Sequence, residues 1–224
     1  MAEGESPVQT HFPAYEARDI PPAFRTRNID RLRSEPLGRI GSLEVRLARD
    51  ADEIAAVQEV RYRVFFEELG ATGGVDRRDA DRFDAVCDHL LVIDTALPGA
   101  ESRRIVGTYR LLRQESASAA GGFYAEDEFE LSRLVARHPG QRFLELGRSC
   151  VLPDYRSKRT IELLWQGIWA YLNHHQIDVI TGCASFPGTV PAAHAEALSY
   201  LAQNCRTDPR WDVGAVAGRS RGRA

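Results

Sequence analysis

Apolar residues alternate with polar ones in some parts of the chain and recur every three to four residues in others, which distinguishes strands from helices. Strand patterns occupy five segments: 43–47, 89–95, 104–113, 141–151 and 178–185. Helical spacing occupies four: Asp50 to about Leu69, 126–138, 160–176 and 191–203. Asp50 and Glu53 have the spacing of a capping box, which supports the start of the first helix.

These elements follow one another as strand, helix, two strands, short helix, strand, long helix, strand and helix. The second and third strands are separated only by a turn and are expected to form a hairpin, whereas the small residues of 116–122 predict a flexible stretch. This order predicts an α+β or α/β fold built on one mixed sheet.

The two ends of the chain differ in composition from its middle. Five of the eleven prolines lie in the first 42 residues, and six arginines against three acidic residues lie between Arg18 and Arg39. We expect 1–42 to be a flexible tail, either disordered or lying on an anionic membrane, with disorder the stronger interpretation. Residues 205–224 are expected to be a short tail with one short strand over 211–217. The folded domain is therefore expected to span 43–204.

Charge and cysteine usage exclude several classes of protein. A net charge of −3 argues against a dedicated nucleic-acid-binding domain, which is usually strongly basic. No run of about 18 apolar residues is present, so no membrane-spanning helix is expected. The N-terminus lacks the basic and apolar segments of a signal peptide. The four cysteines have no metal-binding spacing, and reduced thiols in the cytoplasm are expected.

The end of the first helix carries the sequence RYRVFFE, residues 61–67. Arg61 and Arg63 cannot share a helix face, because residues two apart diverge. One of them is expected to face a pocket that Phe65 or Phe66 lines. The alternative is an amphipathic helix end with solvated arginines.

An acidic loop follows over residues 76–84, where acidic residues alternate with arginines. Solvated charge is the default interpretation. Such a loop can also form an ion-pair network or present carboxylates to a substrate ammonium group. It lacks the glycine and terminal glutamate of an EF-hand, so a calcium loop is not favoured.

The strand LELGRSC, residues 144–150, contains an unusual charge. Strand alternation predicts Glu145 on one face and Arg148 on the other. A buried charge is costly unless it is paired, so Glu145 either pairs with an arginine such as Arg110 or lies desolvated with a raised pKa, able to accept a proton. Cys150 is more consistent with a small buried residue than with a nucleophile.

Three cations precede or open the long helix: Arg156, Lys158 and Arg159. A helix N-terminus offers free N–H groups and the positive end of a dipole, so this region is a candidate anion site. The glycines of a phosphate-binding loop are absent.

Several of these motifs occur together in one known family. RYRVFFEE, DADRFD, VGTYRLL and LELGRSCV resemble the autoinducer-synthase branch of the GNAT-type acyltransferases. The continuations PDYRSKRTIELLWQGIWAYL and GCASFPGTVPAAHAEALSYL resemble the L-ornithine N-alpha-acyltransferases that use acyl carrier protein. The resemblance runs from about Leu43 to Gln203. It implies a GNAT sandwich of the α+β class, with a mixed, mostly antiparallel central sheet flanked by helices.

The resemblance also implies an activity. A 3-hydroxyacyl chain passes from acyl carrier protein to the alpha-amino group of L-ornithine and gives lyso-ornithine lipid. The donor is an acyl-phosphopantetheine on its carrier, and no separate cofactor or metal is expected. Arg159 and Ile161 stand where coenzyme-A enzymes of this fold usually have glycine, and this departure favours the acidic carrier protein, which Arg156, Lys158 and Arg159 suit by charge.

Roles for single residues come with the resemblance, which covers Arg63, Phe66, Asp81, Asp84, Arg110, Glu145 and Arg148. Glu145 is the expected general base, and Arg148 is expected to orient either Glu145 or the acidic loop. Asp81 and Asp84 are expected to hold the ornithine side-chain ammonium. Arg63 or Arg110 is expected to hold its carboxylate, and Phe66 and Phe83 to line the acyl slot. Backbone N–H groups of the strand ending at Val151 are expected to stabilise the oxyanion, in a direct transfer without a covalent enzyme intermediate.

Members of the family usually continue further, so the sheet is expected to lack its last strand or strands. The alternatives are an acyl-homoserine-lactone synthase, a coenzyme-A-dependent N-acetyltransferase, or an inactive chain that binds only acyl carrier protein. A cytoplasmic location is expected, with peripheral contact to the membrane as an option.

Overall fold

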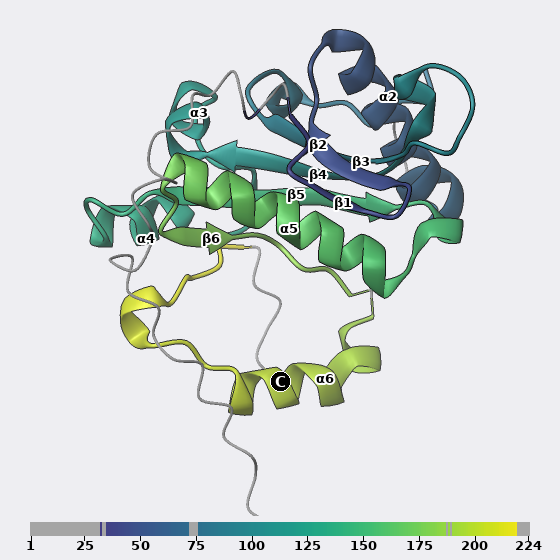
Figure 1. The fold of residues 1–224 in the computed structure, drawn as a ribbon. Helices are drawn as coiled ribbons and strands as arrows, with labels where there is room; N and C mark the ends of the chain where they lie inside the picture. The colour runs from purple at the N-terminus through teal and green to yellow at the C-terminus, as the bar shows by residue number, and fades with distance from the viewer. Residues whose placement is uncertain (1–31, 33–34, 72–75, 187, 189, 219–224) are drawn as a thin grey trace, which may run out of the picture.

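A computed structural model describes residues 32, 35–71, 76–186, 188 and 190–218. Its centre is a six-stranded sheet with α5 on one face and α2 on the other (Figure 1). The strands lie in the order β1-β2-β3-β4-β5-β6, and only the β5–β6 pair is parallel. Their bounds are Gly38–Ile40, Leu43–Leu47, Asp88–Asp94, Ile105–Arg113, Phe143–Val151 and Val179–Thr181. The expected mixed, mostly antiparallel sheet flanked by helices is confirmed.

Helix α2 (Ala51–Tyr62) begins as its sequence predicts. Asp50 accepts a hydrogen bond from the Glu53 N–H at 2.9 Å. The Glu53 side chain instead pairs with buried Arg46 on β2, at 2.8 Å from Nη1. The helix continues as one π-helical segment, η3 (Arg63–Glu68). Val57 and Val60 of α2 and Val64 of η3 pack against β3 and β4, so the end of the helix is fixed against the central strands.

Helix α5 (Lys158–His175) starts at Ser157, whose side chain accepts from the Thr160 N–H. Leu164 and Ile168 are buried against the sheet. The sequence predicts one apolar face that includes Ile161, Trp165 and Trp169, but these three side chains are exposed. The helix covers β1, β2 and β3, and the three side chains lie on its flank, outside the contact with those strands.

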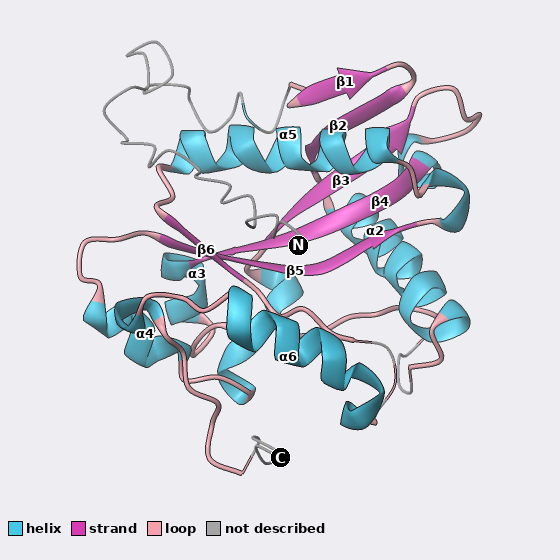
Figure 2. Cartoon of the chain, turned by 90° about the horizontal axis from the view of Figure 1, so that it is seen from below, coloured by secondary structure: helices cyan, strands magenta, loops and turns pink. Residues whose placement is uncertain are grey.

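Strands β5 and β6 part soon after they meet. Their pairing ends at Glu145 and Thr181, while β5 continues to Val151. Figure 2 shows the long β5 extending past the short β6. The sequence predicts a strand over 178–185, and the structure shortens it because the chain leaves β5 beyond Gly182. Beyond Glu145, the outer edge of β5 has no strand partner in the described ranges.

Other differences from the predicted elements come from tertiary contacts. Residues 114–119 form α3 in the stretch expected to be flexible, because Ala117 is buried and Gln114 accepts a hydrogen bond from the Phe143 N–H. The short helix expected over 126–138 is split into a 3₁₀ turn, η6 (Tyr124–Asp127), and α4 (Leu131–Arg137). Strand β1 lies within the expected N-terminal tail, of which residues 1–31, 33 and 34 are outside the described part.

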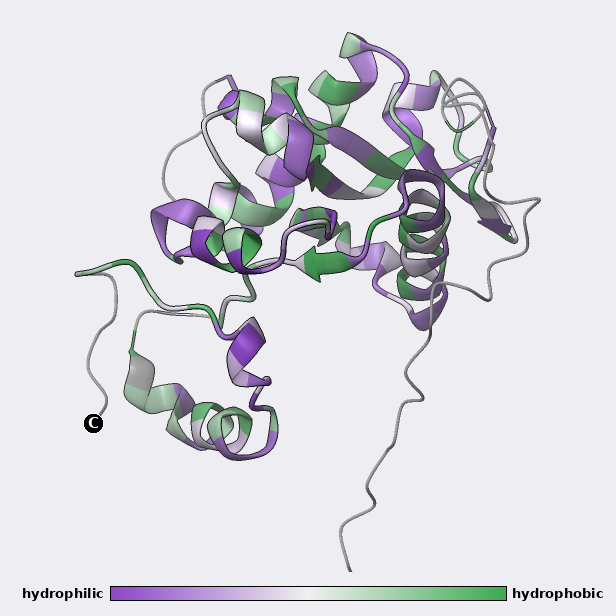
Figure 3. Ribbon diagram, turned by 90° about the vertical axis from the view of Figure 1, so that its left-hand side faces the viewer, coloured by the Kyte–Doolittle hydropathy of each residue, from purple (hydrophilic) through white to green (hydrophobic). Residues whose placement is uncertain are grey.

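The C-terminal segment contacts the domain only in part. Helix α6 (Ala195–Asn204) has no buried side chain, and Figure 3 shows it standing apart from the sheet. The short strand expected over 211–217 is reduced to one bridge between Ala215 and Phe129, with Trp211 stacked on His138 at 3.7 Å. No strand after β6 joins the sheet in the described ranges, and no helix there is long and apolar enough to cross a membrane.

Candidate active site

Charged side chains from α2, the acidic loop, β4 and β5 meet beside the point where β5 and β6 separate. We call this group the charged cluster. It contains three arginines and four carboxylates: Arg61, Arg110, Arg148, Asp79, Asp81, Asp84 and Glu145. The ion-pair network that was one interpretation of the acidic loop is therefore present.

Arg61 and Asp84 form the buried centre of the cluster. Arg61 donates from Nη1 and Nη2 to the two carboxylate oxygens of Asp84, at 2.9 and 2.8 Å, and its Nε lies 2.9 Å from Asp79. Burial by itself raises the pKa of Asp84, but hydrogen bonds and charge from Arg61 outweigh it and lower that pKa to about 2. Asp84 is thus a fixed anion at neutral pH.

Arg110 joins this pair to the acidic loop. Its Nη1 lies 2.7 Å from Asp81 and 3.2 Å from Asp84. Asp81 and Asp84 also cap the 3₁₀ turn η4 (Arg82–Ala85) reciprocally, because each side chain accepts a backbone N–H of that turn. The structure brings together Asp81, Asp84 and Arg110, which are paired with one another, and the substrate contacts expected of them stay predictions.

Arg148 occupies a bulge in β5. Arg110 pairs with Gly147 and Thr108 with Cys150, so the single residue between them faces two residues of β5. Arg148 has φ +50°, a left-handed conformation that is rare for non-glycine residues. The bulge re-aims its side chain toward Asp79 and Asp81, at 3.4 and 3.9 Å, so the predicted placement on the face opposite Glu145 is wrong.

Glu145 is held by backbone rather than by a guanidinium. Its oxygens accept from the N–H groups of Tyr124 and Ala125, at 2.7 and 2.9 Å, in the first turn of η6. The side chain is 3% exposed, and burial raises its pKa although these two hydrogen bonds oppose the shift. Of the two interpretations left open by the sequence, the structure supports the desolvated carboxyl with a raised pKa.

Tyr124 is part of the site and was not identified from the sequence. Its ring lies between two guanidinium groups, 5.2 Å from Arg110 and 5.3 Å from Arg148, and packs edge-on against Phe83 at 5.6 Å. It comes from a turn with no chemical motif, so only the tertiary fold reveals it.

Two predicted residues lie outside the cluster. Arg63 is exposed, and Phe66 stacks on Tyr62 at 5.1 Å. Their places are taken by Arg61 and Phe65, whose ring lies 5.7 Å from the guanidinium of Arg148. Arg61 and Phe65 are four residues apart and so share a helix face. Substrate contacts by Arg63 and Phe66 remain predictions without support from this geometry.

The cations around the start of α5 are exposed, but two of them are paired. Arg156 forms two hydrogen bonds of 2.6 Å to Glu68, which lower the pKa of that carboxyl. Lys158 lies 3.6 Å from Glu162 on the same helix. Arg159 is exposed, and no ion pair is seen for it in the described ranges. Much of the positive charge predicted here is therefore already balanced.

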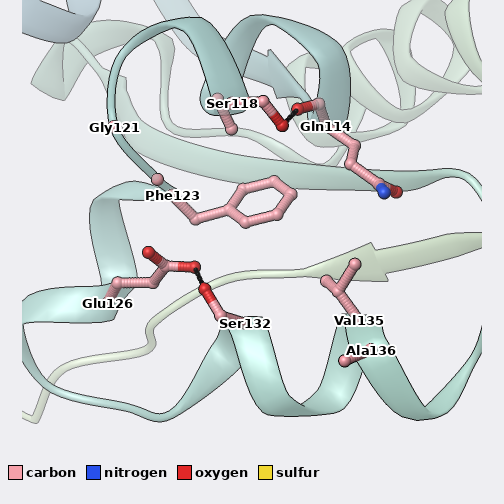
Figure 4. A pocket seen from close by; sticks show the side chains of 10 residues that line it. Gln114, Ser118, Gly121, Phe123, Glu126, Ser132, Val135 and Ala136 are labelled. Atoms are coloured by element: carbon pink, nitrogen blue, oxygen red, sulfur yellow. Dashed lines mark hydrogen bonds between the residues drawn. The ribbon is translucent and has the colours of Figure 1, made fainter.

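Two hollows lie near the cluster. One of about 350 Å³ is lined by residues of α3 and α4, with the Phe123 ring pointing between them (Figure 4). The other, of about 290 Å³, lies at the end of β6 and is lined by Phe129, Leu131, Cys183 and Val213, among others. Ala125, which donates its N–H to Glu145, also lines this second hollow. Phe83 is buried beneath Arg110 and is not among the residues that line either hollow.

Neither a thiolate nor a metal centre is evident in the described ranges. Cys150 is 6% exposed, and burial raises its pKa to about 12, so it is a neutral thiol at physiological pH. No group of three metal-ligating side chains is found in this part of the chain. The polar groups of the charged cluster are carboxylates and guanidiniums, with the backbone N–H groups of η6 beside them.

A family model and curated relatives agree with the resemblance that the sequence motifs indicate. A family model described as an acetyltransferase (GNAT) domain matches residues 60–166. The L-ornithine N(alpha)-acyltransferase of Brucella abortus (strain 2308) is 62% identical over 187 residues, covering 82% of this chain and 66% of the relative. The protein of that name from Rhizobium meliloti (strain 1021) is 59% identical, covering 81% and 63%. The chain thus spans slightly less than two thirds of these relatives.

Among solved structures, FeeM, an N-acyl amino acid synthase from uncultured soil microbes, has a TM-score of 0.47 at 14% identity. The match covers 71% of this chain and 77% of that one. The resemblance drawn from the sequence motifs is confirmed by the curated relatives.

Proposed function

We propose, from the premise that this chain belongs to the GNAT acyltransferases, that it is an L-ornithine N-alpha-acyltransferase. It transfers a 3-hydroxyacyl chain from acyl carrier protein to the alpha-amino group of L-ornithine. The product is lyso-ornithine lipid, the first intermediate of a membrane lipid without phosphorus. The names of the curated relatives support the acceptor, and the donor and pathway follow from the motif resemblance.

One observation carries the proposal: the charged cluster lies where β5 loses its β6 partner. Four carboxylates face three guanidiniums there, which leaves one excess negative charge when Glu145 is ionised. An amino acid with two ammonium groups and one carboxylate has the complementary charge of +1. The free edge of β5 beside it offers backbone N–H groups to a thioester.

The reaction requires one proton transfer before bond formation. Glu145 takes a proton from the alpha-ammonium of ornithine, and the neutral nitrogen attacks the thioester carbonyl carbon. A C–N bond forms and the C–S bond breaks; sulfur leaves as a thiolate that takes up the proton held by Glu145, and the new amide nitrogen releases its second proton to water. The raised pKa of Glu145 suits a group that both accepts and returns a proton, and its oxygens keep further lone pairs beyond the two backbone hydrogen bonds.

The donor approaches the unpaired edge of β5 from the side on which β6 ends. The hollow at the end of β6 has apolar walls from Phe129, Leu131 and Val213 and is the proposed slot for the acyl chain. Exposed Arg159, with Arg156 and Lys158, provides the positive surface for an acidic carrier protein.

A transfer assay tests this function. The purified protein is mixed with 3-hydroxyacyl-acyl carrier protein and L-ornithine, and the lyso-lipid is sought by mass. We expect product with the carrier-bound donor. Product with acyl-coenzyme A only would replace the proposal with a coenzyme-A-dependent transferase. Carrier binding without turnover would show that the chain only binds acyl carrier protein.

A further inference from the structure

The arginines of the charged cluster differ in how firmly they are held. Arg61 and Arg110 are 1% and 3% exposed and make charged hydrogen bonds of 2.7–2.9 Å. Arg148 is 30% exposed, and its ion-pair distances are 3.4 and 3.9 Å. Arg61 and Arg110 therefore serve the fold of the site, whereas the Arg148 guanidinium is available to a ligand.

Two polar atoms around Arg148 also make no hydrogen bond, although each lies within ion-pair distance of an opposite charge. In the described part of the chain, Arg148 Nε and Asp81 Oδ2 are buried atoms that make no hydrogen bond. An unsatisfied buried donor and acceptor usually mark the place of a water or a ligand. One is positive and the other negative, so a ligand that satisfies both carries an anionic and a cationic group.

Tyr124 lies beside Arg148 and Arg110. Its side chain is 37% exposed, and its ring contacts both Arg148 and Arg110. Its backbone N–H is fixed by Glu145. The position of this ring is thus tied directly to the proposed proton acceptor.

We propose that Tyr124, Arg148 and Asp81 form the subsite for the amino-acid acceptor, with Tyr124 as its specificity-determining residue. Arg148, steadied by the ring of Tyr124, takes the acceptor's carboxylate. Asp81 Oδ2 takes the side-chain ammonium. This inference rests on the proposed function, which supplies the class of substrate, and it assigns Arg148 to the acceptor instead of to Glu145.

The test compares Tyr124→Leu and Tyr124→Phe with the wild type and with Tyr200→Leu, a control on exposed α6. Leucine retains apolar packing on Phe83 but has no π face, and phenylalanine restores the ring. Calorimetry measures the Kd for L-ornithine, and steady-state assays give KM for ornithine and for the carrier-bound donor. Melting temperature verifies folding.

We expect Tyr124→Leu to weaken ornithine binding about tenfold, the effect of losing a partly desolvated cation–π contact. The phenylalanine variant and the control stay within about twofold of the wild type, and the KM for the donor does not change. An unchanged Kd in Tyr124→Leu, or an equal loss in Tyr124→Phe, overturns the role of the ring.

Acceptor analogues test the other two residues. 1,4-Diaminobutane lacks the carboxylate, and 2-aminopentanoic acid lacks the side-chain ammonium. We expect Arg148→Ala to lose the preference for ornithine over the diamine, and Asp81→Asn the preference over 2-aminopentanoic acid. If both preferences persist, the subsite is elsewhere.

The two proposals fail separately. Ornithine binding that Tyr124→Leu weakens, without turnover by the wild type, supports the subsite and refutes the transferase function. Turnover with an unchanged KM for ornithine in Tyr124→Leu supports the function and refutes the subsite. A wild type that neither binds nor acylates ornithine refutes both.

Discussion

The carboxylate of Glu145 accepts a hydrogen bond from the backbone N–H of Tyr124 at 2.7 Å, although the two residues are 21 positions apart along the chain. This contact joins β5 to the turn η6. It places a buried carboxyl with a raised pKa beside the aromatic ring that contacts two arginines of the charged cluster. The residues proposed for proton transfer and for acceptor binding therefore meet at the same short turn, η6.

Replacing Glu145 by glutamine is expected to lower kcat about 10²–10⁴-fold, the usual contribution of a general base. Because burial raises the pKa of Glu145, the wild-type rate should increase with pH as this carboxyl loses its proton. This increase of the rate with pH should be absent in Glu145→Gln.

Glutamine also disturbs one of the two backbone hydrogen bonds, so melting temperature is measured alongside. A variant of normal stability that retains full turnover would remove Glu145 from the proton transfer.

The lowered pKa of Asp84 predicts how the free energy of unfolding depends on pH. Its pKa is lowered from an ordinary value near 3.8 to about 2 in the folded protein, so its ionised form favours the native state. This contribution is present above pH 4 and is lost as the pH falls toward 2, amounting to about 2 kcal/mol. Urea unfolding of the wild type and of Asp84→Asn at pH 6 and pH 3 measures it.

We expect Asp84→Asn to be less stable than the wild type at pH 6, because it leaves Arg61 buried without its anion. Its stability should change less between the two pH values. Equal pH dependence in the two proteins would show that Asp84 is not held as an anion.

Gly167 of α5 packs closely against β2 and β3. A Cβ at this position would lie 2.7 Å from Val45 Cγ2 and 3.1 Å from Leu90 Cδ1. Alanine in the middle of a helix normally stabilises it by about 1 kcal/mol relative to glycine, but overpacking here costs about 1–3 kcal/mol. Gly167→Ala should therefore lower the melting temperature, and an increase would contradict the close packing.

Charge reversal at the start of α5 tests the carrier surface. Arg159→Glu should raise the KM for the carrier-bound donor by about threefold to tenfold and weaken its dependence on salt. The KM for ornithine should stay the same. Arg133→Glu, an equally large charge change at an exposed side chain of α4, is the matched control, and an equal effect there would exclude a specific surface at α5.

The periodicity of the sequence predicted the elements that bury a continuous face. Strand β2, the β3–β4 hairpin, and helices α2 and α5 all occur where apolar spacing placed them. Strand β1 was missed because three residues within a proline-rich stretch carry too little pattern, and it forms only by pairing with β2. Helix α3 was missed because it depends on the contact between Gln114 and β5.

The candidate site was predicted only in part, because tertiary contacts and a bulge place some of its residues. Arg110 and Glu145 lie near each other because the neighbouring strands β4 and β5 carry them, and Asp81 and Asp84 join them through the capped turn η4. The choice of Arg61 over Arg63 depends on which helix face meets the acidic loop. The position of Arg148 depends on a bulge that strand alternation does not encode, and Tyr124 enters through a backbone contact available to any residue type.

The most direct measurement locates the new amide. L-Ornithine labelled with heavy nitrogen at the alpha position is incubated with 3-hydroxyacyl-acyl carrier protein and the protein, and the product is fragmented in a mass spectrometer. We expect the acyl chain on the labelled nitrogen. An acyl chain on the side-chain nitrogen, or no transfer under conditions where the carrier binds, would contradict the proposed reaction.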